Sequence, residues 1–267
     1  MKKIVLAATI SSLFAGVASA NDTKLNTEHG TDKETKFGVH QHIGAGFGAG
    51  LEIVTAENLK YYKETNLQLD YQFDITDSWY VKPQFELSIP HSHFSKKDMK
   101  LAFDKENTIN GKLRVSNKIK TGIETGFRLD SGLYTSARYR FETNNIKESF
   151  KGKIGGELGK MGSKAENKLH RLDLKLGYEV SDVVDLSANY IYKRSVSENS
   201  IYVQKRSAKL GDLKTSQHEV ELKAAYIGFG DLQPYAMYTY KSDLDVKTFD
   251  AKFKDDNVFS VGLNYSF

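Results

Sequence analysis

Apolar and polar residues alternate with a period of two along most of the chain. Within residues 133–143, Leu133, Tyr139 and Phe141 share one parity, whereas Arg138 and Arg140 share the other. Successive side chains of a strand point to opposite faces, so this pattern predicts a strand with one apolar and one polar face. The pattern predicts twelve strands, at residues 23–29, 34–43, 47–56, 61–73, 79–92, 112–129, 132–142, 168–180, 184–194, 215–228, 232–242 and 256–267.

The connections between these strands alternate between short and long. Tight turns rich in Gly, Asp and Ser are expected near residues 44–46, 75–77, 130–131, 181–182 and 230–231. The longest connections cover 93–111, 143–167 and 195–214 and are predicted as surface loops, the first of them as a hairpin that projects past a membrane. Short periplasmic turns and long extracellular loops, joining an even number of antiparallel strands, are typical of an outer-membrane barrel.

A soluble β-sandwich would also place apolar faces together and charges outward, so the alternation alone does not exclude one. The C-terminal segment and the aromatic residues favour the barrel. Phe259, Val261, Leu263, Tyr265 and the terminal Phe267 share one face of the last strand, and a terminal aromatic residue resembles the assembly signal that the barrel-assembly machinery reads. Aromatic residues also cluster near strand ends, as interfacial girdles do. The sequence therefore predicts an all-β, twelve-stranded antiparallel transmembrane β-barrel.

The first twenty residues, MKKIVLAATISSLFAGVASA, resemble a bacterial secretory leader. We expect cleavage after Ala20, so that residues 1–20 are a signal peptide and residues 21–267 form the barrel in a Gram-negative outer membrane. After loss of Lys2 and Lys3, 36 basic and 34 acidic side chains remain, so bulk charge indicates no nucleic-acid partner. The chain contains no cysteine, and no later apolar run approaches the roughly 20 residues of a membrane helix.

Twelve strands predict a narrow pore, whose inward residues follow from parity. Strands six to eight supply basic side chains that would concentrate anions, and arginine suits carboxylates because its fork can bind both oxygens. Several such groups along the wall permit weak, multi-site binding. Alternatively, these cations only neutralise neighbouring acids across strands. The predicted basic wall comprises Arg138, Arg140, Arg171, Lys118, Lys120, Arg128 and Lys175, and the predicted acidic side comprises Glu52, Glu64, Asp70, Glu219 and Glu221.

The twelve-strand pattern, RYRFE at residues 138–142 after a turn containing GLY, the long connection that follows, and the closing NYSF resemble the oligogalacturonate-specific porin family of the KdgM/NanC type. This resemblance implies a monomeric channel without cofactor or chemistry. It would pass acidic oligosaccharides or sialic acid passively along a basic wall. The many inward acids and the long connections depart from that pattern and leave the saccharide open. Basic segments 143–167 and 195–214 fit lipopolysaccharide, so lipopolysaccharide and the other outer-membrane lipids are expected partners.

Three other functions remain open: a general small-solute monomeric porin, a plugged receptor or adhesin barrel, and an outer-membrane hydrolase. A hydrolase could use His170 beside Arg171, or His91 beside Ser92, but no motif supports one. His40 with His42, and His91 with His93, lack a third ligand at a diagnostic spacing, so no metal is expected. GGELGKMGS at residues 155–163 lacks the ending of a phosphate-binding loop and is predicted as a surface loop.

Overall fold

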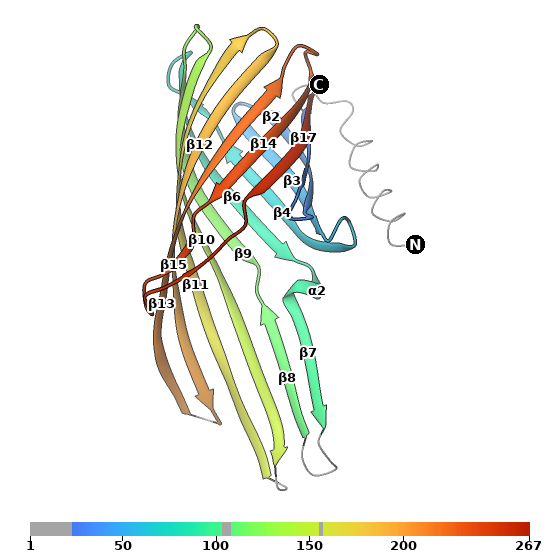
Figure 1. Ribbon diagram of the computed structural model, residues 1–267, viewed down its shortest axis with the longest axis vertical. Coiled ribbons are helices and arrows are strands. Elements are labelled where there is room, and N and C mark those ends of the chain that lie inside the picture. Colours follow the sequence, from blue (N-terminus) through green and yellow to red (C-terminus); the bar gives the residue numbers. More distant parts are fainter. Residues whose placement is uncertain (1–22, 103–107, 155–156, 205) are drawn as a thin grey trace.

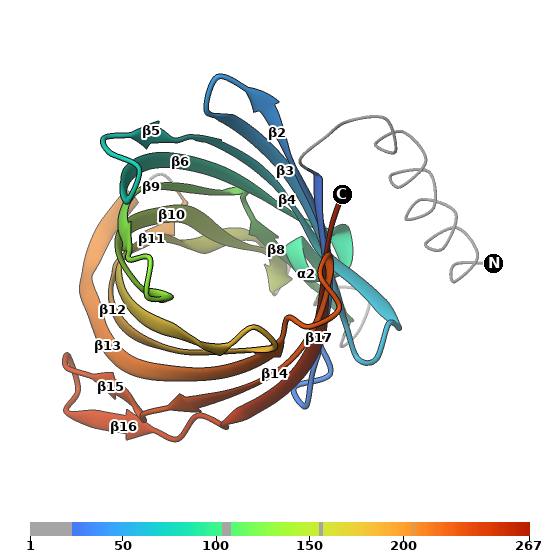
Figure 2. The same ribbon diagram turned by 90° about the horizontal axis from the view of Figure 1, so that it is seen from above.

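The alternating segments pair into one antiparallel sheet that closes on itself. The computed structural model describes residues 23–102, 108–154, 157–204 and 206–267. The ring consists of β1 (Thr23–Gly30), β2 (Thr35–Gly44), β3 (Phe47–Ala56), β4 (Tyr61–Tyr71), β6 (Trp79–Pro90), β9 (Lys118–Arg128), β10 (Leu133–Ile154), β11 (Glu157–Ser181), β12 (Val184–Val203), β13 (Arg206–Tyr226), β14 (Leu232–Lys241) and β17 (Val258–Ser266). The last strand pairs with the first, and Figure 2 looks along the resulting barrel. The predicted twelve-stranded barrel is confirmed.

The barrel exposes apolar side chains around its outside. Leu174, Leu222 and Phe259 are 44%, 52% and 48% exposed although each belongs to a paired strand. Asp173 and Ser260, which adjoin Leu174 and Phe259 in sequence, are buried on the inside. A soluble sandwich would bury the apolar face, so this inside-out distribution identifies the lipid-facing surface of a membrane barrel. Among the described residues, no helix is long and apolar enough to cross a membrane.

Short turns join the strands at the end of the barrel where β1 begins and β17 ends, as predicted. Gly44 and Gly46 have φ of 108° and 86° in the turn between β2 and β3, a conformation that favours glycine. Phe267 closes this end, because its amide donates to the Thr23 carbonyl at 3.0 Å and its carbonyl accepts from the Thr23 amide at 2.8 Å. The expected signal peptide lies outside the described residues.

At the opposite end, four strands continue far beyond the ring (Figure 1). Segments 143–167 and 195–214 were predicted as loops, and this prediction is wrong for the described residues, which extend β10, β11, β12 and β13. The apolar signal disappears there because both faces of the extension meet water. The predicted projecting hairpin is present as β7 (Lys96–Ala102) and β8 (Thr108–Val115), which follow the short helix α2 (Ser92–Ser95). Smaller elements are β5 (Phe73–Asp74), β15 (Leu244–Val246) and β16 (Ala251–Phe253).

Candidate functional site

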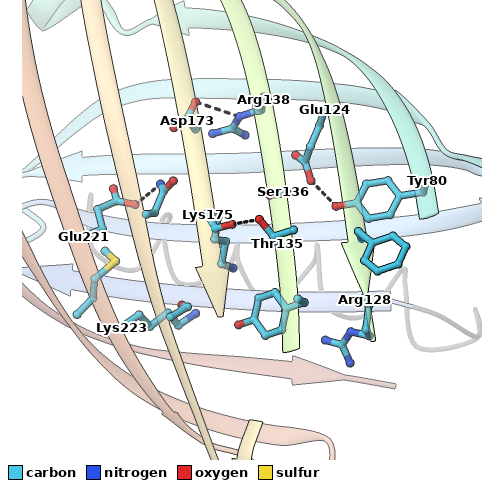
Figure 3. A pocket seen from close by; sticks show the side chains of 15 residues that line it. Tyr80, Glu124, Arg128, Thr135, Ser136, Arg138, Asp173, Lys175, Glu221 and Lys223 are labelled. Carbon is cyan, nitrogen blue, oxygen red and sulfur yellow. Dashed lines mark hydrogen bonds and ion pairs between the residues drawn. The ribbon is translucent and has the colours of Figure 1, made fainter. Parts of the chain in front are cut away.

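The candidate site is the barrel lumen, whose wall is built from the polar parity of each strand. The register places Arg138 of β10 opposite Glu124 of β9 on one side and opposite Asp173 of β11 on the other. Two hollows of about 460 and 390 Å³ lie inside the barrel, and both are lined by Arg138 and Glu124. Figure 3 shows the first hollow, where side chains from neighbouring strands converge. Polar side chains of β9, β10 and β11 therefore line these hollows.

The predicted arginines form one cluster with two carboxylates. Arg171 holds Asp173 through two nitrogens, with Nε and Nη2 at 2.8 and 2.6 Å from Oδ1. Arg138 Nε donates to Oδ2 of the same carboxylate at 3.3 Å. Arg140 Nη2 lies 2.7 Å from Oε1 of Glu142. Each guanidinium is thus already bonded to the wall, which makes these arginines structural elements of the lumen as well as cations.

The cluster keeps an excess of positive charge in spite of these pairs. Lys118 Nζ lies 3.7 Å from Glu142, and Lys120 is bonded to Glu86. Three arginines and two lysines therefore share three carboxylates. The Nε atom of Arg140 is buried and has no hydrogen-bond partner among the described residues. Pairing with carboxylates explains how most side chains of this cluster are oriented. The cluster nevertheless contains two more cations than carboxylates.

A second set of cations lies closer to the turn end of the barrel and rests on tyrosine rings. Lys82 lies 5.6 Å from the Tyr80 ring centroid, and Lys175 lies 5.3 Å from that of Tyr134. The third, Lys223, lies 3.8 Å from the ring of Tyr235. In the described part of the chain none of these lysines has a carboxylate within ion-pair distance. A ring face attracts an ammonium without cancelling its charge, so these lysines remain available to an anion in the lumen.

The tyrosines are held by glycines and carboxylates of neighbouring strands. Each ring covers a glycine, where a Cβ atom would overlap it: Tyr80 covers Gly126, Tyr134 covers Gly177, and Tyr235 covers Gly262. Each hydroxyl donates to a carboxylate, with distances of 2.6 Å to Glu124, 2.9 Å to Asp185 and 3.0 Å to Glu28. Those carboxylates therefore fix the tyrosines while the lysines stay on the ring faces.

The remaining predicted residues are distributed around the wall and its rim. Arg128 lies 3.0 Å from Glu179 and 5.1 Å from the Tyr134 ring, at the turn end. Most of the predicted acidic side chains have polar partners: Glu52 with Asn66 at 2.8 Å, Asp70 with His40 at 2.6 Å, Glu219 with Lys193 at 2.5 Å, and Glu221 with Asn189 at 2.8 Å. Glu64 is half-buried on β4. These acids are thus held by hydrogen bonds, but among these partners only Lys193 is a lysine or arginine.

Parity also assigns Lys82 of β6 and Lys223 of β13 to the polar face, but the predicted basic wall was drawn from strands six to eight and included only Lys175 of these three lysines. The signal that could have found them is an inward tyrosine opposite an inward glycine on the next strand. Tyr80 opposite Gly126 is one example, and Tyr134 opposite Gly177 is another. Such a pair can be recognised in the sequence only when the register between the two strands is known.

The histidines do not assemble a reactive site. His170 lies on the outer face, and its Nδ1 is 2.7 Å from the Tyr139 hydroxyl, which removes it from the lumen. His91 precedes helix α2 and accepts from the His93 amide at 3.5 Å. Among the described residues, no group of three His, Asp or Glu side chains could hold a metal ion. Gly155 and Gly156 of the GGELGKMGS segment lie outside the described residues, and the remainder belongs to β11.

No protein-family model and no curated protein sequence matches the chain. Three solved structures are similar over nearly the whole of their length. The NanC porin is 13% identical with a TM-score of 0.50, over 92% of this chain and 100% of its own. The KdgM porin in complex with disordered oligogalacturonate is 14% identical with a TM-score of 0.53, over 92% of this chain and 99% of its own. The translocator domain of autotransporter NalP from Neisseria meningitidis is 14% identical with a TM-score of 0.53, over 99% of this chain and 96% of its own.

The chain has the fold of outer-membrane barrels. At these identities the likeness shows the fold alone, and a porin and a translocator domain resemble it to the same degree. Any distinction between the two functions must therefore come from the lumen of this chain.

Proposed function

We propose that the chain forms a monomeric channel in a Gram-negative outer membrane and admits small anionic saccharides by passive diffusion. The candidate solutes are acidic oligosaccharides such as oligogalacturonates, or sialic acid. In this proposal the leader is removed after Ala20, and the pore acts without cofactor or chemistry. The resemblance to the oligogalacturonate-specific porins supports it, as does the similarity in fold to a KdgM porin solved with oligogalacturonate.

The observation that carries the proposal is the set of lumen lysines without carboxylate partners. Lys175 and Lys223 line the same hollow, together with Arg138 and Asp173 (Figure 3). Inside a narrow channel with low-dielectric walls, unpaired cations focus the field and raise the local anion concentration. Because the lysines rest on ring faces rather than in a closed cage, they bind an anion weakly enough to release it, which permeation requires.

The arginine cluster contributes the remaining positive charge. Replacement of Arg138 and Arg140 by Ser removes its excess of two cations, so anion preference should fall while the barrel stays folded, because substitutions in a lumen mainly tune selectivity. Reversal potentials of single channels across a salt gradient measure this preference, and the shift in gel mobility on heating reports the folded barrel. Unchanged selectivity in the double variant would count against the basic wall.

The identity of the saccharide is tested by liposome swelling. Galacturonate oligomers and sialic acid should enter faster than neutral sugars of similar size, because only the acids gain from the lumen cations. Equal rates for acidic and neutral sugars would favour a general small-solute porin. A plugged receptor or adhesin barrel would show neither swelling nor steady conductance steps, so the bilayer recording separates it from both kinds of pore.

A further inference from the structure

The outer face of the strand extension carries a row of basic residues that the channel does not use. The register sets Lys96 opposite Arg114, Arg114 opposite Lys147, and Lys147 opposite Lys164. Ser200 continues the row and lies opposite Lys209. These five cations, from five strands, are called the outer basic row. Lys164 has the same parity on β11 as the exposed Leu172, so the row continues the lipid-facing surface of the barrel.

Charges of one sign directly opposite each other destabilise a sheet. Three members of the row have an acidic neighbour. Arg114 lies 2.8 Å from Asp98, Lys164 lies 3.4 Å from Glu166, and Glu198 attracts Lys209 as well as Lys164. Lys96, Lys147 and Lys209 are exposed, and no ion pair involves them within the described ranges. These acids offset the row only in part, so an external anion would relieve the repulsion that remains.

A second group of cations lies closer to the apolar surface of the barrel. A line of acids, Glu166, Glu198 and Asp212, which are paired across β11, β12 and β13, separates it from the row. Lys168 is 2.6 Å from Glu198, and this hydrogen bond lowers the pKa of the Glu198 carboxyl below its usual value. Arg194 and Lys214 are exposed and have no ion pair in the part of the chain that the structure describes. Arg194 follows Tyr192 of the aromatic girdle by two residues, which places its guanidinium at the level of the lipid headgroups.

The height of the outer basic row distinguishes among membrane anions. Lys147 follows the outward Phe141 by six residues, which corresponds to about 20 Å along a strand and to about 15 Å above the membrane at the usual tilt. The headgroup layer of a phospholipid bilayer adds only about 5–7 Å on each side. A phospholipid phosphate could reach Arg194 and Lys214 but not the row. An anion that reaches both levels must be a tall, multiply charged glycolipid.

We propose that this outer face binds lipopolysaccharide. The lipid phosphates would lie against Arg194 and Lys214, and the acidic groups of the core sugars would lie against the outer basic row. The position of the cations on the lipid-facing wall, their two heights and their excess over the acids beside them all fit this one ligand. The site lies outside the lumen, so the proposal is independent of the channel function.

The test uses the complete mature chain folded in detergent and fluorescently labelled probes: lipopolysaccharide that retains its phosphorylated core, lipid A without a core, phosphatidylglycerol, and soluble polygalacturonate. The row variant is Lys147→Ser, Lys164→Ser, Lys209→Ser. The control variant is Lys60→Ser, Lys252→Ser, Lys254→Ser, which removes the same charge from exposed positions elsewhere. Fluorescence anisotropy gives each affinity, and the heat-dependent gel shift confirms folding.

We expect the parent to bind core-bearing lipopolysaccharide more tightly than lipid A. The row variant should lose about tenfold or more in affinity for core-bearing lipopolysaccharide. It should bind lipid A as the parent does, and the control variant should match the parent. Equal loss in the row and control variants would overturn the proposal, as would phosphatidylglycerol binding as tightly as lipopolysaccharide. Equally tight, row-dependent binding of polygalacturonate would replace it with recognition of a soluble polymer. Conductance of the row variant should equal that of the parent whichever ligand binds.

Discussion

Replacement of the two unpaired lysines of the first hollow tests the channel directly. Lys175→Gln and Lys223→Gln remove two positive charges, while the tyrosine rings and their hydrogen bonds to carboxylates remain. Because neither lysine has a carboxylate partner among the described residues, their loss leaves no newly unpaired acid in the wall. The double variant should therefore fold as the parent does and differ from it only in the potential of the lumen.

The size of the effect follows from the hollow. A volume of about 460 Å³ corresponds to a radius of about 5 Å, which sets the approach of a permeating ion to the wall. At 5 Å in a water-filled lumen one charge contributes about 0.8 kcal/mol, and salt at 0.1 M reduces this to about 0.5 kcal/mol. Two lysines then contribute about 1 kcal/mol, so the anion concentration in the hollow should fall about fivefold.

Single-channel recording under a potassium chloride gradient measures this change as a shift of the reversal potential. The chloride-to-potassium permeability ratio should fall by at least about fivefold, because chloride is depleted and potassium is enriched. Lys252→Gln with Lys254→Gln removes the same charge from two exposed positions, one in β16 and one just after it, and should leave the ratio unchanged. If the lumen variant and this control give the same ratio, the lysines do not set selectivity and the electrostatic argument is refuted.

Three further predictions test the barrel. Gly177→Ala should lower the free energy of unfolding by about 1–3 kcal/mol, because the added methyl overlaps the Tyr134 ring; urea unfolding measures this, and the penalty should shrink in a Tyr134→Ala background. The fluorescence of Trp79, an outward residue and the single tryptophan, should be quenched by brominated lipid, whereas an unquenched signal would contradict the lipid-facing assignment. Deletion of Phe267 should reduce the heat-modifiable barrel recovered from the outer membrane, because it removes the main-chain bonds to Thr23; full recovery would argue against the assembly signal.

Parity was sufficient to predict the two faces of the barrel because membrane and lumen impose opposite polarity on alternate residues. It could not predict ion pairing. The contact of Arg138 with Asp173 depends on the register between β10 and β11, and no single-strand pattern contains that register. The same holds for Lys223, which reaches the ring of Tyr235 on a neighbouring strand. Parity within one strand therefore assigns a side chain to a face of the sheet, but it does not identify its ion-pair partners.

The prediction for the strand extension beyond the membrane was wrong for a different reason. Strands β10 to β13 leave the hydrocarbon and meet water on both faces, so the apolar half of the alternation is absent. Main-chain pairing and side-chain contacts, rather than burial of an apolar face, hold the ladder there, as at the paired positions Lys147 and Lys164. Polarity patterns detect a strand only where two environments differ, and loops 143–167 and 195–214 were predicted from the lack of that contrast.

The two kinds of lumen cation divide structural and electrostatic roles. Guanidinium groups are planar and bind both carboxylate oxygens, as Arg171 does with Oδ1 and Oδ2 of Asp173, so they suit permanent contacts within the wall. Ammonium groups on tyrosine faces keep their charge and can turn toward a solute, as Lys175 and Lys223 can. A wall built only of unpaired arginines would hold carboxylates too firmly for rapid passage. The paired arginines stabilise the folded wall, and the unpaired lysines bind a permeating anion weakly enough to release it.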